Sequence, residues 1–274
     1  MATDRKTKNR LTVFVATLCV YLAIGNAAMA AEAENKKNWS IQAAVRYTYL
    51  TPGGKMGGTN GSDVKQTDLS ELGMESGSGA WGVSIGGQYY RPQFFLSGQQ
   101  SSFSGYGVTS NDISQGDLTI PAGSAVNTTM DLGIYTAAIT YDFLEGKNKL
   151  GLGLGLMGLD YSVDYTQVAT GVQITIDETY PLPLLAANYS YFWKKVELAG
   201  LIGGAYINID GDKVGYLNID VSARYAFYQG ANWAWMASLG YRYIGLYMDI
   251  SDGSNRFEAD LDFTGPYIGV RFDF

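Results

Sequence analysis

The sequence has 274 residues and contains no histidine, a single cysteine and only six prolines. Without histidine, the Ser-His-Asp and Cys-His catalytic arrangements are excluded, as are metal sites with histidine ligands. After residue 24 no apolar run approaches the ~20 residues that a membrane-spanning helix requires. If the chain crosses a membrane, it must therefore do so with strands that close into a barrel.

The N-terminal segment has the pattern of a secretory signal peptide. Four basic residues precede an apolar run from Leu11 to Ile24, and Ala28-Met29-Ala30 follows as a small-x-small cleavage site. The only cysteine, Cys19, lies inside this run, so the mature chain has neither disulfides nor thiol chemistry. We expect residues 1–30 to be removed and residues 31–274 to form one domain.

The mature chain is acidic. Removal of residues 1–30 takes away four of the 19 basic residues and one of the 26 acidic residues, which leaves a net charge of 10 negative. This charge argues against nucleic acid and against anionic lipid head groups as partners.

Segments of alternating hydrophobicity recur along the chain, and long and short connections alternate between them. This rhythm is typical of a barrel with long outer loops and tight periplasmic turns. It predicts an all-β fold, a single transmembrane antiparallel up-and-down β-barrel of ten strands, with eight or twelve as alternatives. The expected strands lie at about 38–50, 81–90, 93–103, 130–143, two between 150 and 193, 196–208, 214–227, 233–248 and 256–274.

The chain ends in a strand whose apolar and other residues alternate from Tyr267 to Phe274. This strand resembles the terminal signal by which Gram-negative outer-membrane barrels are recognised for assembly. Tyr267, Gly269, Phe272 and Phe274 occupy the signal positions. In style the chain is similar to the OmpA-like and OmpW-like barrels, although those have eight strands. The resemblance implies an outer-membrane location, contacts with membrane lipid and lipopolysaccharide, and the barrel-assembly machinery as a partner.

Aromatic residues near the expected strand ends predict two girdles at the membrane surfaces. The periplasmic girdle would contain Trp39, Phe143, Trp193, Phe227, Trp233, Phe272 and Phe274, and the outer girdle Tyr49, Trp81, Phe103, Tyr206 and Tyr216. Prolines cannot donate to a ladder, so Pro181, Pro183 and Pro266 are expected at bulges or strand ends. At Pro266 the apolar positions also change from odd to even numbers.

The same alternation assigns eight charged side chains to the barrel interior. They are Arg46, Asp142, Glu197, Asp220, Arg224, Arg242, Arg271 and Asp273. Because an isolated buried charge is costly, we expect arginine–carboxylate pairs in a narrow lumen. Ten strands lie close to the ~8-strand limit at which side chains fill the interior. Both a plugged lumen and a constricted channel remain open.

The leading functional hypothesis is a non-enzymatic barrel with a narrow, charge-lined lumen that passes small solutes, of unspecified identity. The alternative is a structural or surface-interaction barrel that displays long outer loops. A carboxylate-based enzyme is a third reading, with Asp160 and Asp164, or Asp210 and Asp212, as candidate pairs. The Asp210–Asp212 and Asp249–Asp252 loops lack the full ligand spacing of a calcium loop, so no metal or cofactor is expected.

Overall fold

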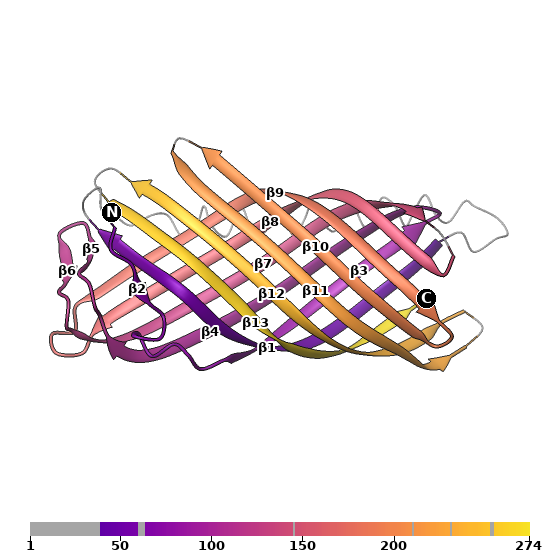
Figure 1. Ribbon diagram of the computed structural model, residues 1–274, viewed down its shortest axis with the longest axis horizontal. Helices are drawn as coiled ribbons and strands as arrows, with labels where there is room; N and C mark the ends of the chain where they lie inside the picture. The colour runs from indigo at the N-terminus through magenta and orange to yellow at the C-terminus, as the bar shows by residue number, and fades with distance from the viewer. Residues whose placement is uncertain (1–38, 60–63, 145, 210, 231, 253–254) are drawn as a thin grey trace.

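The computed structural model describes residues 39–59, 64–144, 146–209, 211–230, 232–252 and 255–274. The expected signal peptide lies outside these residues. Within them, ten long strands form one antiparallel sheet, and the last strand pairs with the first to close a barrel (Figure 1). The expected ten-stranded up-and-down barrel is confirmed. Its long strands are β1 (Trp39–Thr59), β3 (Ser78–Tyr89), β4 (Pro92–Val108), β7 (Ala125–Leu144), β8 (Asn148–Gln167), β9 (Gln173–Trp193), β10 (Val196–Ile209), β11 (Asp212–Gln229), β12 (Ala234–Asp252) and β13 (Asn255–Asp273).

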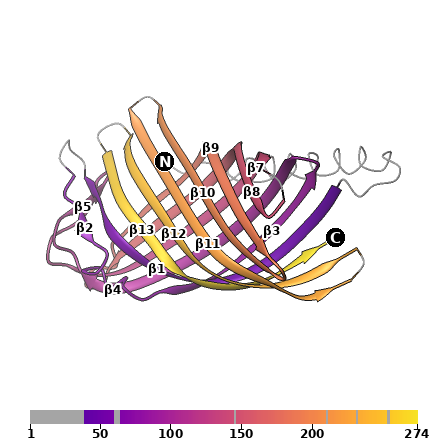
Figure 2. The same cartoon turned by 45° about the vertical axis from the view of Figure 1, so that its right-hand side comes forward.

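The two ends of the barrel differ in their connections. At one end, two-residue turns join β3 to β4 and β9 to β10, and the carboxyl terminus lies at this end (Figure 1). At the other end, the long connections contain the short strands β2 (Thr67–Asp68), β5 (Ile113–Gln115) and β6 (Leu118–Ile120), as Figures 1 and 2 show. Because barrels of this kind have short periplasmic turns, the first end is the periplasmic end. No helix in the described residues is long and apolar enough to span a membrane.

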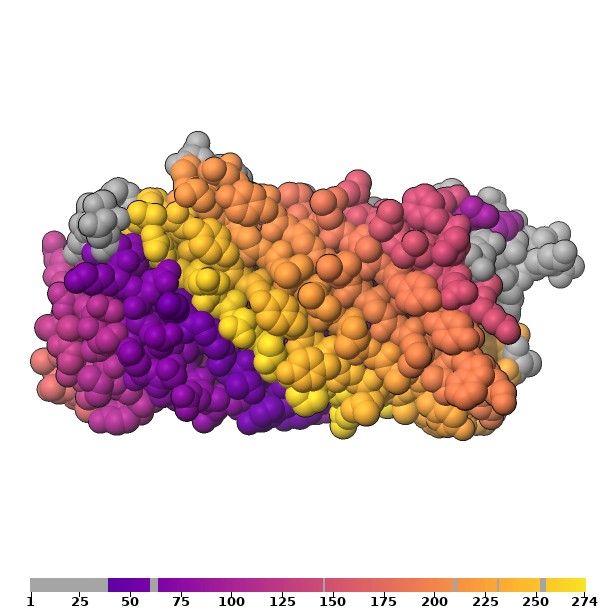
Figure 3. Space-filling model, in the orientation of Figure 1, coloured from indigo at the N-terminus to yellow at the C-terminus, as the bar shows by residue number. Residues whose placement is uncertain are grey.

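An apolar belt covers the outside of the periplasmic half. On β9 the exposed side chains include Trp193, Tyr189 and Leu185, whereas Asp177, farther toward the outer end, is an exposed carboxylate. The belt therefore spans about ten residues of a tilted strand, which matches the 9–11 residues that cross a bilayer. Figure 3 shows side chains of β11, β12 and β13 covering one face of this wall.

The bulge or strand end expected at Pro266 is absent, so that expectation is wrong. The ladder between β12 and β13 runs through Pro266 without a register shift, and odd-numbered residues face the interior along the whole strand. Phe257 and Phe263 are therefore buried inside the barrel and do not face lipid. The apolar positions change from odd to even because apolar side chains point outward only in the membrane belt and point inward beyond it.

The other two prolines also lie inside a strand. The ladder between β8 and β9 passes Pro181 and Pro183 without a bulge. On the other side of β9, the ladder to β10 reaches only Leu185 and ends before both prolines. Each proline thus needs no donor on that side, which is where proline is tolerated in a sheet.

Two residues that the sequence assigned to the outer girdle lie inside the barrel. Phe103 is 2% exposed and packs against Phe263 with ring centroids 5.3 Å apart, and Tyr216 is buried as well. Trp81 and Tyr206 are exposed on the outer wall, as a girdle requires. The interior is therefore divided into a polar periplasmic half and an apolar outer half.

Candidate functional site

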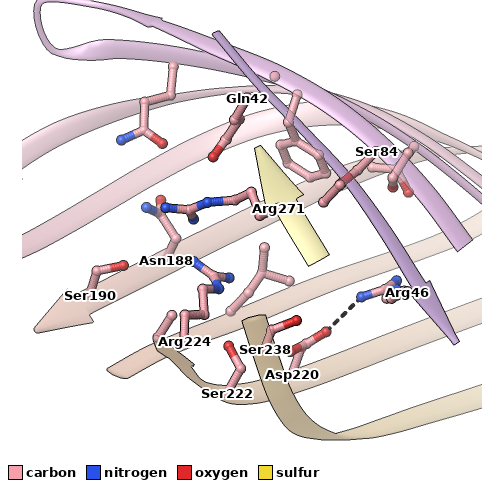
Figure 4. Close-up of a pocket in the computed structure, with 18 of the residues that line it drawn as sticks. Gln42, Arg46, Ser84, Asn188, Ser190, Asp220, Ser222, Arg224, Ser238 and Arg271 are labelled. Carbon is pink, nitrogen blue, oxygen red and sulfur yellow. Dashed lines mark hydrogen bonds and ion pairs between the residues drawn. The ribbon is translucent and has the colours of Figure 1, made fainter. Parts of the chain in front are cut away.

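A polar pocket of about 430 Å³ lies in the periplasmic half of the barrel, and all ten long strands contribute to its lining. Every second residue of a strand faces the interior, so each strand presents a row of side chains to this space. Figure 4 shows Gln42 and Arg46 from β1 together with Asp220, Ser222 and Arg224 from β11. Residues far apart in sequence are thus brought together only by closure of the ring.

The first charged cluster in the pocket is centred on Arg46 and is called the Arg46 cluster. Its Nη1 donates to Asp220 Oδ2 at 2.9 Å, the contact marked in Figure 4. The Tyr267 hydroxyl donates to Asp220 Oδ1 at 2.5 Å. Gln99 Oε1 accepts from Arg46 Nη2 at 3.3 Å and from Arg242 Nη1 at 2.5 Å. Two guanidinium groups are therefore held beside one carboxylate.

The second cluster, called the Glu197 cluster, lies nearer the periplasmic end. Glu197 Oε1 accepts from Arg224 Nη1 at 2.8 Å and from the Ser190 hydroxyl at 2.8 Å. Its Oε2 lies 3.0 Å from Arg271 Nη2, and Arg271 Nε lies 2.8 Å from Asp273 Oδ1. Since Glu197 is only 3% exposed, these pairs offset the cost of burying its charge.

The eighth interior charge, Asp142, is fully buried but does not line the pocket. Its Oδ2 accepts from Gln93 Nε2 at 2.6 Å and from Gln88 Nε2 at 3.1 Å. Lys149 Nζ donates to Gln88 Oε1 at 3.2 Å, so a cation lies one side chain away from this carboxylate. This arrangement is a hydrogen-bonded carboxylate held by amides, which differs from the arginine pairing that the sequence suggested.

The charges that line the pocket do not balance. Glu197, Asp220 and Asp273 supply three negative charges. The positive charges are five, from Arg46, Lys149, Arg224, Arg242 and Arg271. The lining therefore carries an excess of two positive charges, although the chain as a whole is acidic.

Above this pocket the outer half of the interior is filled by an apolar core, which the sequence reasoning missed. On β8 the inward residues Met157, Leu159, Tyr161, Val163 and Tyr165 are between 0 and 1% exposed. A signal for this core exists in the sequence, because Asp and Ser occupy alternate positions along the same stretch of β8. Polar residues at the outward positions indicate water outside the barrel, and therefore an apolar interior.

The first long connection supplies a plug to this core. Leu69, Leu72 and Met74 lie in a turn that folds into the barrel mouth, and each is 0 to 1% exposed. The backbone of the turn lies directly against β4, where Val108 N donates to Glu71 O at 2.9 Å. A Cβ atom at Gly107 would overlap the Glu71 carbonyl oxygen, so only glycine permits this close approach.

The second long connection adds to the same closure. Ile113 of β5 and Ile120 of β6 are 2% and 0% exposed and belong to the same apolar cluster as Leu72 and Phe263. We call residues 64–77 and 109–124 together the cap. The cap and the strand ends form one packed unit, so the outer loops are not free-standing.

An ionic group stands at the outer rim, beside the cap. Asp249 Oδ1 accepts from Arg256 Nε at 2.9 Å, and its Oδ2 accepts from Lys213 Nζ at 3.1 Å. The hydrogen bond from Arg256 is the main reason why the pKa of Asp249 lies below its usual value, and Lys213 adds to the effect. Arg256 Nη2 also contacts Glu258 at 2.7 Å. These contacts link β11, β12 and β13 at the rim.

The candidate carboxylates from the sequence accept hydrogen bonds from residues on the neighbouring strands. Asp160 accepts from the Thr179 hydroxyl at 3.0 Å, and Asp164 accepts from the Thr175 hydroxyl. Asp212 accepts from the backbone of Ser251 at 2.8 Å, whereas its candidate partner, residue 210, lies outside the described residues. In the described part of the chain, no group of three or more Cys, Asp or Glu side chains could hold a metal ion.

The four residues of the expected assembly signal lie in the last part of β13 and at Phe274, which follows it. Phe274 completes the ring, since its N donates to Ile41 O and its O accepts from Ile41 N, both at 2.8 Å. Its ring packs against Trp39, and Phe272 packs against Trp235 at 5.0 Å between centroids. Two positions differ in environment, since Gly269 faces the interior and Tyr267 donates to Asp220 within the Arg46 cluster.

No protein-family model matches the sequence, and no curated protein matches it. Solved structures are similar in fold. The outer membrane protease OmpT from Escherichia coli aligns over 89% of this chain and 99% of its own, with a TM-score of 0.53 and 14% identity. The attachment invasion locus protein Ail of Yersinia pestis, at 8% identity, covers 85% of this chain and 99% of its own with a TM-score of 0.38. The translocator domain of the autotransporter NalP from Neisseria meningitidis has 14% identity, coverages of 96% and 98%, and a TM-score of 0.37. The chain has the fold of Gram-negative outer-membrane β-barrels, and its apolar belt fits that location.

Proposed function

We propose that this protein is a closed, non-enzymatic outer-membrane barrel whose ordered cap forms a surface for contacts outside the cell. The observation that carries the proposal is the apolar core across the outer half of the interior. Water and ions cross a protein only through polar space, and side chains such as Leu72 and Phe263, at 0% exposure, leave none at this level. The solute-channel hypothesis therefore applies only to the periplasmic pocket, which ends below the core.

The absence of histidine supports the non-enzymatic part of the proposal. Barrel enzymes such as the omptin proteases rely on a histidine acid or base, and this chain has none. Among the described acidic candidates, Asp160 and Asp164 accept hydrogen bonds from threonine hydroxyls, and Asp212 accepts one from the backbone of Ser251. The likeness to OmpT concerns the fold and carries no activity to this chain.

Exposed apolar side chains at the outer ends of β4 and β8, next to the cap, support a contact surface. Tyr106, Val108 and Val168 are 64%, 51% and 51% exposed, beyond the membrane belt. Val108 pairs with Ala125 in the ladder, and the backbone of Val168 donates to Ala125 O at 2.9 Å, so these residues are neighbours. Apolar side chains gathered in water are a feature of sites that bind another molecule.

Planar-bilayer recordings test the closed barrel. We expect no resolvable single-channel current from the wild-type protein. The combined variant Leu69→Ser, Leu72→Ser, Met74→Ser should conduct, because hydroxyl groups in the turn admit water to the barrel mouth. The matched control is Glu71→Ser with Glu75→Ser, which changes exposed residues of the same segment and should stay silent. Heat-modifiable mobility on gels confirms that each variant is folded. Stable open steps from the wild type would overturn the proposal.

A further inference from the structure

The ladder between β9 and β10 is shorter than the β8–β9 and β10–β11 ladders on either side of it. The ladder between β9 and β10 begins near Trp193 and ends at the pair Leu185–Gly204. Beyond this pair β9 continues along β8 as far as Gln173, and β10 continues along β11 as far as Ile209. In the described residues no ladder joins residues 173–184 to residues 205–209. We call this gap the seam, and Figure 1 shows the tips of the β8–β9 and β10–β11 hairpins apart from each other.

The sequence keeps the seam unpaired and lines it with apolar side chains. Pro181 and Pro183 have no N–H group, so at these positions β9 cannot donate to a neighbouring strand. Tyr180 of β9 and Ala205 and Ile207 of β10 lie on the two sides of the seam, partly buried against the apolar core. These three side chains therefore border the seam on the inner side of the wall, next to the apolar core.

At the foot of the seam the lipid-facing wall is hollowed into a groove of about 600 Å³. Ala187 and Gly204 form its floor, because their side chains are smaller than those of the leucine and isoleucine residues around them. Leucine and isoleucine side chains form its sides, and they are Leu152, Leu154, Leu185, Ile202 and Leu217. Every one of these side chains is apolar, so the groove suits a hydrocarbon chain and offers no partner to a polar group.

The height of the groove identifies the leaflet from which an occupant would come. Leu185 lies eight residues from Trp193 along β9, toward the outer end of the barrel. Because the belt spans about ten residues, Leu185 lies in its outer part. Tyr206 follows Gly204 by two positions on the same face and is 61% exposed, as expected at the outer membrane surface. The groove therefore lies at the level of the outer-leaflet acyl chains.

We propose that this groove binds one acyl chain of lipid A in the outer leaflet. The contact is made with the hydrocarbon alone, so the negative charge of the protein, which disfavours contacts with anionic head groups, does not oppose it. The inference rests on the outer-membrane location and does not depend on whether the barrel is closed. It assigns a ligand to a hollow in the lipid-facing wall whose lining side chains are all apolar.

Two glycines of β10 provide a test variant and a matched control. A Cβ at Gly204 would meet only the Tyr216 carbonyl oxygen at 3.6 Å, so a side chain can be added there and would fill the groove. A Cβ at Gly200 would meet only the Asp220 carbonyl oxygen at 4.0 Å. Gly200 lies on the same outward face, four residues toward the periplasm, and does not line the groove. The substitutions are Gly204→Phe and Gly200→Phe.

Purified lipid A is titrated into the detergent-solubilised barrel, and bound lipid is counted by native mass spectrometry. The wild type and Gly200→Phe should retain one lipid A molecule with equal affinity. Gly204→Phe should bind roughly tenfold more weakly, the effect of excluding about two methylene groups from burial. Gel mobility confirms that the variants are folded. Equal weakening by both variants, or no lipid A retained by the wild type, would overturn the proposal. Phosphatidylethanolamine retained as tightly as lipid A would overturn the assignment to lipid A.

Discussion

Removal of the Glu197 carboxylate should be the most damaging single change in the polar half of the barrel. Glu197 is 3% exposed and is the shared acceptor for Arg224 at 2.8 Å and Arg271 at 3.0 Å. Loss of one partner of a buried ion pair costs about 3–5 kcal/mol, because the remaining charge is left without compensation. The Arg224 side chain is 27% exposed to the pocket, and Arg271 keeps Asp273 as a partner. We therefore expect Glu197→Ala to lower the free energy of unfolding by the smaller value, ~3 kcal/mol.

The measurement is a urea titration of the barrel in lipid vesicles, followed by tryptophan fluorescence. Glu197→Gln keeps an acceptor for the Ser190 hydroxyl but loses the charge, so it should cost about half as much, since charge-assisted hydrogen bonds are roughly twice as strong as neutral ones. Glu71→Ala removes an exposed carboxylate of the cap and should change stability by less than about 0.5 kcal/mol. If Glu197→Ala cost no more than about 1 kcal/mol, the value typical of any substitution, the reasoning about buried pairs would be refuted.

Three further predictions concern the outer half and the rim. Phe263→Ala should cost about 3–5 kcal/mol in the same titration, because it leaves a cavity in a fully packed core, and a loss like that of a surface residue would contradict this packing. Trp81→Ala, which removes an exposed aromatic from the outer girdle, should leave the core intact and cost clearly less than Phe263→Ala. The pKa of Asp249 is lowered in the folded protein, so its contribution to stability is present above its unfolded pKa of about 4 and is lost as the pH falls through the lower folded pKa. Asp249→Asn should therefore lower stability at pH 7 and flatten its decline below about pH 4, and an unchanged acid profile would contradict the role of the rim contacts.

The short periplasmic turns and the membrane belt could be predicted from the local sequence pattern alone. Alternation of apolar and polar residues from Tyr267 to Phe274 has a period that only a strand produces, and it holds wherever one side faces lipid. The ten-strand count followed from ten such segments. The same reasoning ended the first strand near Leu50, although β1 continues to Thr59, because Gly53, Gly54 and neighbouring glycines were taken to indicate a loop. Pairing with β13 and with β2 holds this glycine-rich stretch in the sheet.

The apolar core in the outer half of the barrel interior could not be predicted from the local sequence pattern. Alternation is symmetric: it separates two faces of a strand but does not state which face is inside. In the belt, lipid outside reverses the order found in water, and beyond the belt the order is restored. Alternation along β13 therefore did not reveal that Phe257 and Phe263 face the interior. That assignment requires knowledge of where the belt ends along β13.

Sequence by itself determined that this protein has no histidine chemistry, that it is a barrel, and that charged side chains are spaced to face inward. These properties depend on composition and on near neighbours in the chain. Tertiary structure decided which charges meet, as Arg46 does with Asp220 across 174 positions, and that the turn at Leu72 plugs the mouth. The same is true of the seam, which exists because two adjacent strands separate at Leu185 and Gly204. Such contacts depend on ring closure and on the packing of distant segments, and no local periodicity encodes them.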